Sequence, residues 1–122
     1  MPWTYSQSTG ELRHNGELVG TGYSGAGRAA STGRNNPAMQ TSANRGPIPQ
    51  GQWRIGPAHN RPHKGPTVMA LTAVGHNAFG RSGFLIHGDN PTNNASEGCI
   101  ILGPAIRRQI AASGDPSLSV VQ

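Results

Sequence analysis

The sequence predicts a mainly β protein with many turns and one or two short helices. Its 18 glycines and 10 prolines separate short apolar runs at 68–71, 84–86 and 100–102, as in folds built from short strands. A helical spacing of apolar residues occurs in one segment, near 104–113. A chain of 122 residues without repeats is enough for one modest core, so we expect residues 1–122 to form a single domain.

The N-terminal segment predicts an antiparallel β-meander. Residues 3–6, 11–14 and 17–23 alternate loosely between apolar and polar side chains. The dipeptide Asn15-Gly16 stands between the second and third of these segments, and Asn-Gly is a strong indicator of a tight hairpin.

Residues 24–40 have neither a helical nor a strand period, and they are rich in small and polar side chains. We expect a long loop here, with a short helical turn at 36–39. Loops of this length in a compact domain are usually functional or mobile. The sequence leaves open whether this loop gates a site or is only a surface excursion.

The rest of the chain predicts further strands and one helix. Loops are expected at 56–66 and 75–82, and the expected strands are 52–55, 68–74, 84–87, 99–102 and 118–121. The helix spans 104–113, because Pro104 suits a first helical turn and Gly114 suits a helix end. Its spacing places Ile106 and Ile110 on the inner face, with Arg107 and Arg108 turned towards solvent.

The formal charge of +5 comes mainly from arginines that are scattered along the chain. A basic surface favours an anionic partner such as a cell-wall polymer. Aromatic residues make up 5% of the chain, too few for a base-stacking surface, so we expect no nucleic-acid binding.

One cysteine excludes an intrachain disulfide, so the fold suits a reducing or an oxidising compartment. No N-terminal segment joins a basic start to a long apolar run, so we expect no signal peptide. No apolar stretch approaches the ~20 residues of a membrane span, so we expect no membrane insertion.

Cys99 and His87 are the residues best suited to chemistry. His87 ends one apolar run, and Cys99 begins the next one twelve residues later. A thiolate attacks carbonyl carbons, and we expect the nearby imidazole to lower the pKa of the thiol. Gly98 allows a tight turn whose N–H groups could face an oxyanion. A lone cysteine before three apolar residues can equally be a small buried side chain, so the residues alone leave both interpretations open.

The other histidines raise the alternative of a metal site. The candidate ligands are His59, His63, His76, His87 and Cys99. Pro62 interrupts the helix that would place His59 and His63 on one face, and the chain has no zinc motif with a second cysteine. We therefore expect no metal and no cofactor.

The segments around Cys99 and His87 resemble the catalytic domain of the L,D-transpeptidases (YkuD-type). That signature is a His-Gly, a spacer and Ser/Thr-x-Gly-Cys, which His87-Gly88 and Ser96-Glu97-Gly98-Cys99 match. Residues 46–55 resemble the Pro-x-Gly-x-aromatic-x-Ile segment found upstream in the same family. The resemblance implies an L,D-transpeptidase-like β-sandwich or barrel.

Over about residues 3–121 the chain is similar to the compact L,D-transpeptidase-like effectors of type VI secretion systems. The most specific blocks are 80–89 and 96–102. This resemblance implies a peptidoglycan stem peptide as substrate, a cognate immunity protein and a secretion-system carrier. It also implies synthesis in the cytoplasm and delivery to the periplasm of a target bacterium.

The resemblance implies an antibacterial cysteine enzyme, acting as an L,D-carboxypeptidase, as an L,D-transpeptidase that exchanges D-amino acids, or as both. Cys99 would attack the carbonyl of the third stem residue, with His87 as base and the Gly88 carbonyl orienting the imidazole. The N–H groups of Gly98 and Cys99 would bind the oxyanion, and Ser96 would belong to the catalytic set. The alternative is a non-catalytic cell-wall-binding or secretion-associated module of the same fold.

Other positions of the resemblance concern substrate binding. Glu97 stands where the transpeptidase motif has a histidine, and this departure favours hydrolysis over cross-linking. Arg81 and Arg54 are candidates for binding the terminal carboxylate of the stem, with a surface ion pair as the alternative for each. Asp89 is a candidate for positioning His87 or the substrate, with a role in a turn as the alternative.

Overall fold

The computed structural model describes residues 2–62 and 64–122, which form a mainly β fold and confirm the predicted class. The strands are β1 (Trp3–Ser6), β2 (Glu11–His14), β3 (Glu17–Thr21), β4 (Tyr23–Ser24), β5 (Gly51–Ile55), β6 (His59–Arg61), β7 (Gly65–Val74), β8 (Leu85–His87), β9 (Ile100–Ile101) and β10 (Ser117–Val121). The helical elements are the 3₁₀ turns η1 (Ala30–Thr32), η2 (Pro37–Met39) and η3 (Ala78–Gly80), and the α-helix α1 (Pro104–Ser113).

The strands pair in one mixed sheet with the order β3-β2-β1-β10-β5-β7-β8-β9-β4, and β6 also pairs with β7. The pairs β1–β10 and β8–β9 are parallel, whereas the others are antiparallel. The order begins at β3 and ends at β4, so the sheet is not a closed barrel, one of the two shapes that the resemblance implied.

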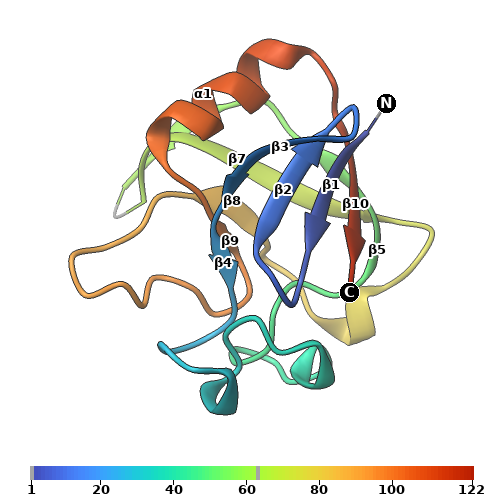
Figure 1. Cartoon of the computed structure of the whole chain (residues 1–122), viewed down its shortest axis with the longest axis vertical. Coiled ribbons are helices and arrows are strands. Elements are labelled where there is room, and N and C mark those ends of the chain that lie inside the picture. Colours follow the sequence, from blue (N-terminus) through green and yellow to red (C-terminus); the bar gives the residue numbers. More distant parts are fainter. Residues whose placement is uncertain (1, 63) are drawn as a thin grey trace.

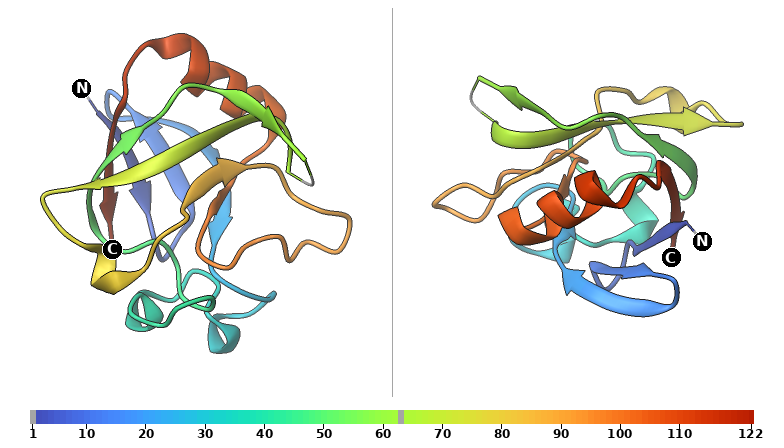
Figure 2. Two further views of the ribbon diagram at one scale, coloured as in Figure 1. Left: turned by 180° about the vertical axis from the view of Figure 1, so that it is seen from behind. Right: turned by 90° about the horizontal axis from the view of Figure 1, so that it is seen from above.

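Helix α1 covers one end of the sheet, and the loops that carry η1 and η2 lie at the opposite end (Figure 1). Seen from above, β5, β6 and β7 form one side of the molecule and β1, β2 and β3 form the other (Figure 2). The core includes Trp3, Tyr5, Trp53, Ile86 and Ile100. No helix in the described part of the chain is long and apolar enough to cross a membrane.

The predicted N-terminal meander is confirmed by the antiparallel pairs β1–β2 and β2–β3. Asn15 and Gly16 both have positive φ, 54° and 81°, as a tight Asn-Gly hairpin requires. The predicted strand 17–23 is interrupted at Gly22, where the chain stops pairing with β2 and begins pairing with β9. A Cβ at Gly22 would lie 1.9 Å from the carbonyl oxygen of Ile101, so the close approach of these segments requires glycine.

The predicted helix is confirmed at both ends. Pro104 occupies its first position, and Gly114 ends it in the left-handed conformation with φ of 71°. Ile110 is buried and Ile106 packs against the core, as the spacing predicted. The prediction that Arg107 faces solvent is wrong, because this side chain is only 6% exposed.

Strand β6 and turn η3 lie in segments where loops were predicted. All three residues of β6 are exposed, so no apolar period could reveal the strand. It forms because its backbone pairs with β7, with His59 opposite Val68. Strand β7 also begins earlier than the predicted 68–74, since its first residues belong to this hairpin.

Candidate active site

The parallel pair β8–β9 brings His87 and Cys99 together. Ile86 lies opposite Ile100, and His87 lies opposite Ile101. In the same register Cys99 falls opposite the residue two positions before His87. Side chains alternate along a strand, so Cys99 and His87 lie on the same face as diagonal neighbours. The predicted pair of thiol and imidazole is therefore assembled on adjacent strand ends.

The His87 imidazole is oriented by its neighbour's carbonyl. Nδ1 lies 2.8 Å from the carbonyl oxygen of Gly88. A carbonyl oxygen can only accept a hydrogen bond, so Nδ1 carries the proton and Nε2 presents its lone pair. Nε2 is buried and has no hydrogen-bond partner among residues 2–62 and 64–122. This arrangement matches the expected orientation by Gly88 and leaves a basic nitrogen available.

Burial keeps the His87 imidazole neutral. The side chain is 2% exposed, and this desolvation lowers its pKa below the ordinary value of 6.5. The hydrogen bond to Gly88 opposes this shift, whereas the positive charges of Lys64 and Arg107 reinforce it. Asp89 adds a smaller opposing effect. At neutral pH the imidazole is therefore a base rather than a cation.

The Cys99 thiol is uncharged as well. Burial raises its pKa above the ordinary value, and the nearby Leu85 N–H and Lys64 only partly oppose this shift. The thiol pKa is therefore not below its ordinary value, as the expectation of an imidazole-activated thiol would require, because burial dominates. Sγ lies 3.8 Å from the carbonyl oxygen of Gly83. Because burial shifts both pKa values against the charged forms, the pair is a neutral thiol beside a neutral imidazole.

Ser96 builds the turn before the cysteine. Its Oγ donates to the Cys99 carbonyl oxygen at 2.6 Å and accepts from the Gly98 and Gly25 N–H groups at 3.0 and 2.9 Å. These three bonds occupy a buried hydroxyl, so Ser96 shapes the loop and does not face a substrate. The Gly98 N–H is also occupied, which contradicts its expected role in an oxyanion hole. The Cys99 N–H is the donor of the expected pair that remains.

Gly98 is confined on several sides. Its φ is +135°, and a Cβ would lie 2.7 Å from Nη2 of Arg81 and 2.8 Å from Cε1 of Phe84. Its carbonyl oxygen accepts from Oγ of Ser24 at 2.8 Å, and the same Oγ accepts from the Ile48 N–H. Residues 96–99, which we call the cysteine loop, are therefore packed directly on the segment that connects β4 to β5.

Arg81 is bound to the backbone rather than poised for a substrate carboxylate. Nη1 donates to the carbonyl oxygens of Gln40 and Pro47 at 2.6 and 2.8 Å. Nη2 donates to the carbonyl oxygens of Gly46 and Glu97 at 3.0 and 3.3 Å. Arg81 thus joins the 40–47 loop to the cysteine loop, and its expected role in binding substrate carboxylate is wrong for this geometry.

The other two predicted substrate-binding residues, Arg54 and Asp89, do not line the pocket at Cys99. Arg54 is exposed on β5, in the part of the sheet paired with β7 and β10, and does not line the pocket at Cys99. Asp89 accepts from the Tyr23 hydroxyl at 2.6 Å, from the Asn90 N–H at 2.8 Å and from the Asn93 side chain. Both of its oxygens are used within the loop that follows β8, so Asp89 orders that loop.

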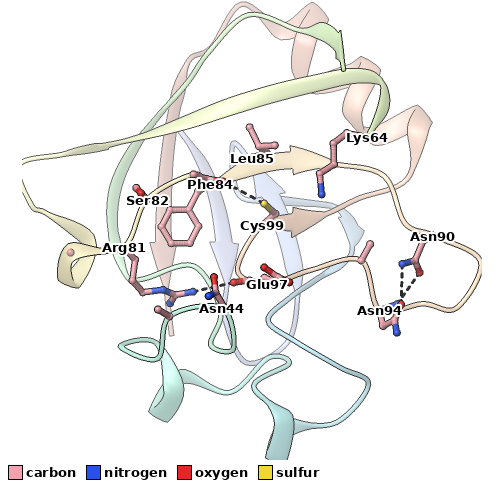
Figure 3. Close-up of a pocket in the computed structure, with 14 residues that line it drawn as sticks. Asn44, Lys64, Arg81, Ser82, Phe84, Leu85, Asn90, Asn94, Glu97 and Cys99 are labelled. Carbon is pink, nitrogen blue, oxygen red and sulfur yellow. Dashed lines mark hydrogen bonds between the residues drawn. The ribbon is translucent and has the colours of Figure 1, made fainter. Parts of the chain in front are cut away.

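A pocket of about 540 Å³ opens above Cys99 (Figure 3). Lys64, from the β6–β7 hairpin, extends into it on the side of Cys99, and Glu97 lines it from the cysteine loop. Asn90 and Asn94 line its outer part and are joined by a hydrogen bond of 2.9 Å. Sequence reasoning missed Lys64, because the residue is in a loop segment with no motif and reaches the site only through the hairpin.

The histidines considered for a metal site do not gather. His76 lies 3.0 Å from the Gln52 carbonyl oxygen and packs edge-on against Trp53, and His59 is exposed on β6. His63 lies outside the described residues. Within the ranges 2–62 and 64–122, no group of three or more His, Cys, Asp or Glu side chains is placed to hold a metal ion.

These features define a mainly β protein with a candidate cysteine–histidine site, in which Cys99 lines a polar pocket and His87 is buried on the same face of the β8–β9 pair. A family profile described as the Tlde1 domain matches residues 19–116. The match covers most of the 122 residues, so the chain belongs to the Tlde1 domain family, a family of type VI secretion effectors. No curated protein matches the chain.

Proposed function

We propose that this effector domain is an antibacterial enzyme that trims peptidoglycan stem peptides through a cysteine thioester, as an L,D-carboxypeptidase that can also exchange the terminal D-amino acid. The observation that carries the proposal is the His87 imidazole, whose Nδ1–H is bound to the Gly88 carbonyl oxygen and whose Nε2 is unpartnered among the described residues. The His87 side chain lies on the same face of the β8–β9 pair as Cys99. Membership of the Tlde1 family supports the role of effector.

The first half of the reaction forms the thioester. The Cys99 side chain turns from the Gly83 carbonyl towards His87, and Nε2 takes the thiol proton as Sγ bonds to the substrate carbonyl carbon. The tetrahedral oxyanion accepts a hydrogen bond from the Cys99 N–H. It collapses when the bond to the terminal D-amino acid breaks, and the imidazolium returns its proton to the leaving amine.

The second half releases the shortened stem. Neutral His87 takes a proton from water as the water oxygen attacks the thioester carbonyl, and the Cys99 thiolate leaves and recovers the proton. The product is a stem that ends in a free carboxylate. A free D-amino acid can replace water, and its amine then forms a new peptide bond. The same base serves both outcomes, since each nucleophile must lose one proton.

The raised thiol pKa supports general-base catalysis over a pre-formed thiolate–imidazolium pair. Burial disfavours the charged form of both Cys99 and His87, so the proton moves only when the attack occurs. The Glu97 carboxylate raises the thiol pKa further. In a site of this kind Cys99 is a thiol, not a thiolate, before the substrate binds. Its proton passes to His87 as Sγ attacks the substrate carbonyl carbon.

Lys64 is the residue that we assign to the substrate's terminal carboxylate. It lines the pocket beside Cys99, whereas Arg81 in the same pocket is bound by four carbonyl oxygens. An ammonium on a flexible stem can pair with a carboxylate without losing other hydrogen bonds. Glu97 faces the same space and favours a small neutral nucleophile over a second, anionic stem peptide, so we expect trimming to exceed cross-linking.

The Tlde1 family suggests delivery of the domain to a target cell. We infer that it acts in the periplasm, where stem peptides are accessible, and that the producing cell is protected by a cognate immunity protein. A secretion-system carrier would bring the domain there. The basic charge of +5 favours contact with the anionic wall polymer.

The test uses a purified disaccharide tetrapeptide and mass spectrometry of the products. The wild-type protein should release the terminal D-Ala, and Cys99→Ser and His87→Ala should each reduce release by a factor of 1,000 or more, an order-of-magnitude expectation for loss of nucleophile or base. His59→Ala is the matched control, because His59 is exposed on β6 and outside the pocket.

Unchanged release in Cys99→Ser would overturn the mechanism. No release by the folded wild-type protein, together with binding to intact peptidoglycan sacculi, would favour the non-catalytic cell-wall-binding module instead. Adding a labelled D-amino acid to the same reaction measures how the thioester divides between water and amine.

A further inference from the structure

Arg107 is a buried cation with an unusual set of partners. Its Nε donates to the Leu102 carbonyl oxygen at 3.0 Å, and Nη1 donates to those of Pro66 and Thr67 at 2.6 and 3.4 Å. The described residues contain no salt bridge to this side chain. A guanidinium that is 6% exposed and bound to neutral carbonyls is costly to bury, so its position calls for a specific explanation.

The guanidinium packs on the Gly88 backbone. A Cβ at Gly88 would lie 2.8 Å from Nη2 and 3.2 Å from Cζ of Arg107, so the guanidinium occupies the space where a side chain at position 88 would begin. The carbonyl oxygen of Gly88 is the acceptor that orients the His87 imidazole. Arg107 therefore packs against the residue whose carbonyl oxygen determines which imidazole nitrogen carries the proton.

The same side chain joins the other segments around His87. Leu102, which accepts from Nε, donates its own N–H to the His87 carbonyl oxygen at 3.1 Å. Thr67, which accepts from Nη1, has a positive φ of 57°, a strained conformation for a β-branched residue that persists only when its surroundings enforce it. Thr67 stands near the start of β7, in the hairpin that carries Lys64.

We propose that Arg107 is a positioning residue: its guanidinium fixes the Gly88 peptide, and through it the His87 imidazole, so that Nε2 is the unprotonated nitrogen facing the Cys99 side. The requirement explains why an arginine is buried on the inner side of α1. A planar group with several donors can contact Gly88 and bind three carbonyl oxygens at once, whereas a lysine ammonium cannot.

The test reads the imidazole directly in the free protein. Two-bond ¹H–¹⁵N correlation spectra distinguish the Nδ1–H and Nε2–H tautomers of His87. Wild type should show the Nδ1–H tautomer, and Arg107→Met should show a mixture or the Nε2–H form. Arg107→Lys should also lose the Nδ1–H form although it keeps the charge. Arg108→Met, an exposed neighbour on the same helix, is the matched control and should resemble wild type.

Kinetics separate positioning from a general loss of structure. This part rests on the proposed function. In Arg107→Met, kcat for D-Ala release should fall about 10- to 100-fold with KM changed less than about threefold, because misplacing a catalytic group acts on the chemical step. The acidic limb of the kcat/KM profile should lie at higher pH in Arg107→Met than in Arg107→Lys, since both variants lose the hydrogen bond to Gly88 but only the first also removes a positive charge near His87. Lys64, Asp89 and the Cys99 thiol also face the imidazole and are unchanged in both variants.

A second variant tests the same contact in case Arg107→Met does not fold. Gly88→Ala places a methyl group where the guanidinium lies and should change the tautomer in the same way. The effects of the two substitutions should not add in the double variant, because both act on one contact. A folded Arg107→Met or Gly88→Ala protein that keeps the Nδ1–H tautomer would overturn the proposal. Absence of D-Ala release by wild type would instead refute the proposed function while leaving the tautomer result decisive.

Discussion

The two halves of the candidate site are built on different foundations. The cysteine half depends on side-chain hydrogen bonds from Ser24, Ser96 and Arg81 to the backbone of loops. The histidine half depends on the β8–β9 pair and on a buried arginine from α1. Both halves use an arginine with carbonyl partners, but Arg81 joins loop to loop, whereas Arg107 joins helix, sheet and hairpin.

The difference predicts how each half responds to perturbation. Loops that are ordered mainly by side-chain hydrogen bonds open locally at a lower free energy than sheet and helix contacts. We therefore expect the cysteine half to be adaptable, because its thiol must turn from the Gly83 carbonyl towards the His87 imidazole. The histidine half should stay fixed, so that the tautomer of His87 is preserved through the reaction.

The largest expected effect is on the cysteine half, in Gly98→Ala. The added Cβ would meet Arg81 and Phe84, and the residue would be forced to keep a φ of +135°. We expect D-Ala release to fall by more than about 100-fold and the free energy of unfolding to fall by about 2–4 kcal/mol, measured by chemical denaturation. Gly75→Ala is the matched control, because Gly75 also has positive φ but has open space around it. This substitution should lower the free energy of unfolding by about 1 kcal/mol. Equal costs at the two glycines would contradict this account of the cysteine loop.

The next effect tests whether Arg81 is a structural residue of that half. Arg81→Met leaves four carbonyl oxygens without this donor, and we expect the free energy of unfolding to fall by about 2–3 kcal/mol. Hydrogen exchange should accelerate in 40–47 and around Cys99, and much less in β8. Arg54→Met, at an exposed position, should change neither quantity. A variant that is fully stable but has a raised KM would restore Arg81 as a substrate-binding residue.

A smaller effect concerns pH and the histidine half. The folded pKa of His87 lies below 6.5, so on acidification the unfolded chain binds a proton before the folded protein does. Stability should therefore be independent of His87 above about pH 7 and should decrease as pH falls through 6.5 towards the folded pKa. Subtracting the pH dependence of His87→Gln from that of wild type isolates this contribution. A difference that grows in favour of wild type on acidification would show that His87 is charged in the fold.

The smallest expected effect is at Lys64, which lines the pocket from the exposed hairpin. In Lys64→Met, KM for the tetrapeptide should rise about three- to tenfold with little change in kcat, as expected for one screened contact between an ammonium and a carboxylate. A substrate analogue with an amidated C-terminus should abolish the difference between wild type and Lys64→Met. If amidation raises KM by the same factor in wild type and in Lys64→Met, Lys64 does not bind the carboxylate.

Local patterns predicted much of this molecule. The Asn-Gly hairpin and the helix with proline first and glycine last need only their own residues, and both are confirmed. The pairing of His87 with the Gly88 carbonyl is also local, and the structure shows that contact. The burial of Arg107 could not be predicted from helical spacing, since its carbonyl partners come from Pro66, Thr67 and Leu102.

The roles of polar residues depended on loop paths that the sequence does not encode locally. Arg81 was expected to face a substrate, but three of its acceptors lie 34 to 41 positions earlier, in a loop without a period. The Gly98 N–H was expected to be available, but Ser96 accepts from it two residues away. That contact is short in sequence, and a turn motif of Ser-x-Gly could have indicated it.

The most direct test of the central claim is to trap the acyl-enzyme. Wild-type protein mixed with a disaccharide tetrapeptide and quenched in acid should gain, by intact-protein mass spectrometry, the mass of the stem without its terminal D-Ala. Peptide mapping should locate that mass on Cys99, and Cys99→Ser should show no thioester. Release of D-Ala at the wild-type rate with no adduct on Cys99 at any quench time, and with Cys99→Ser equally active, would contradict a cysteine thioester mechanism.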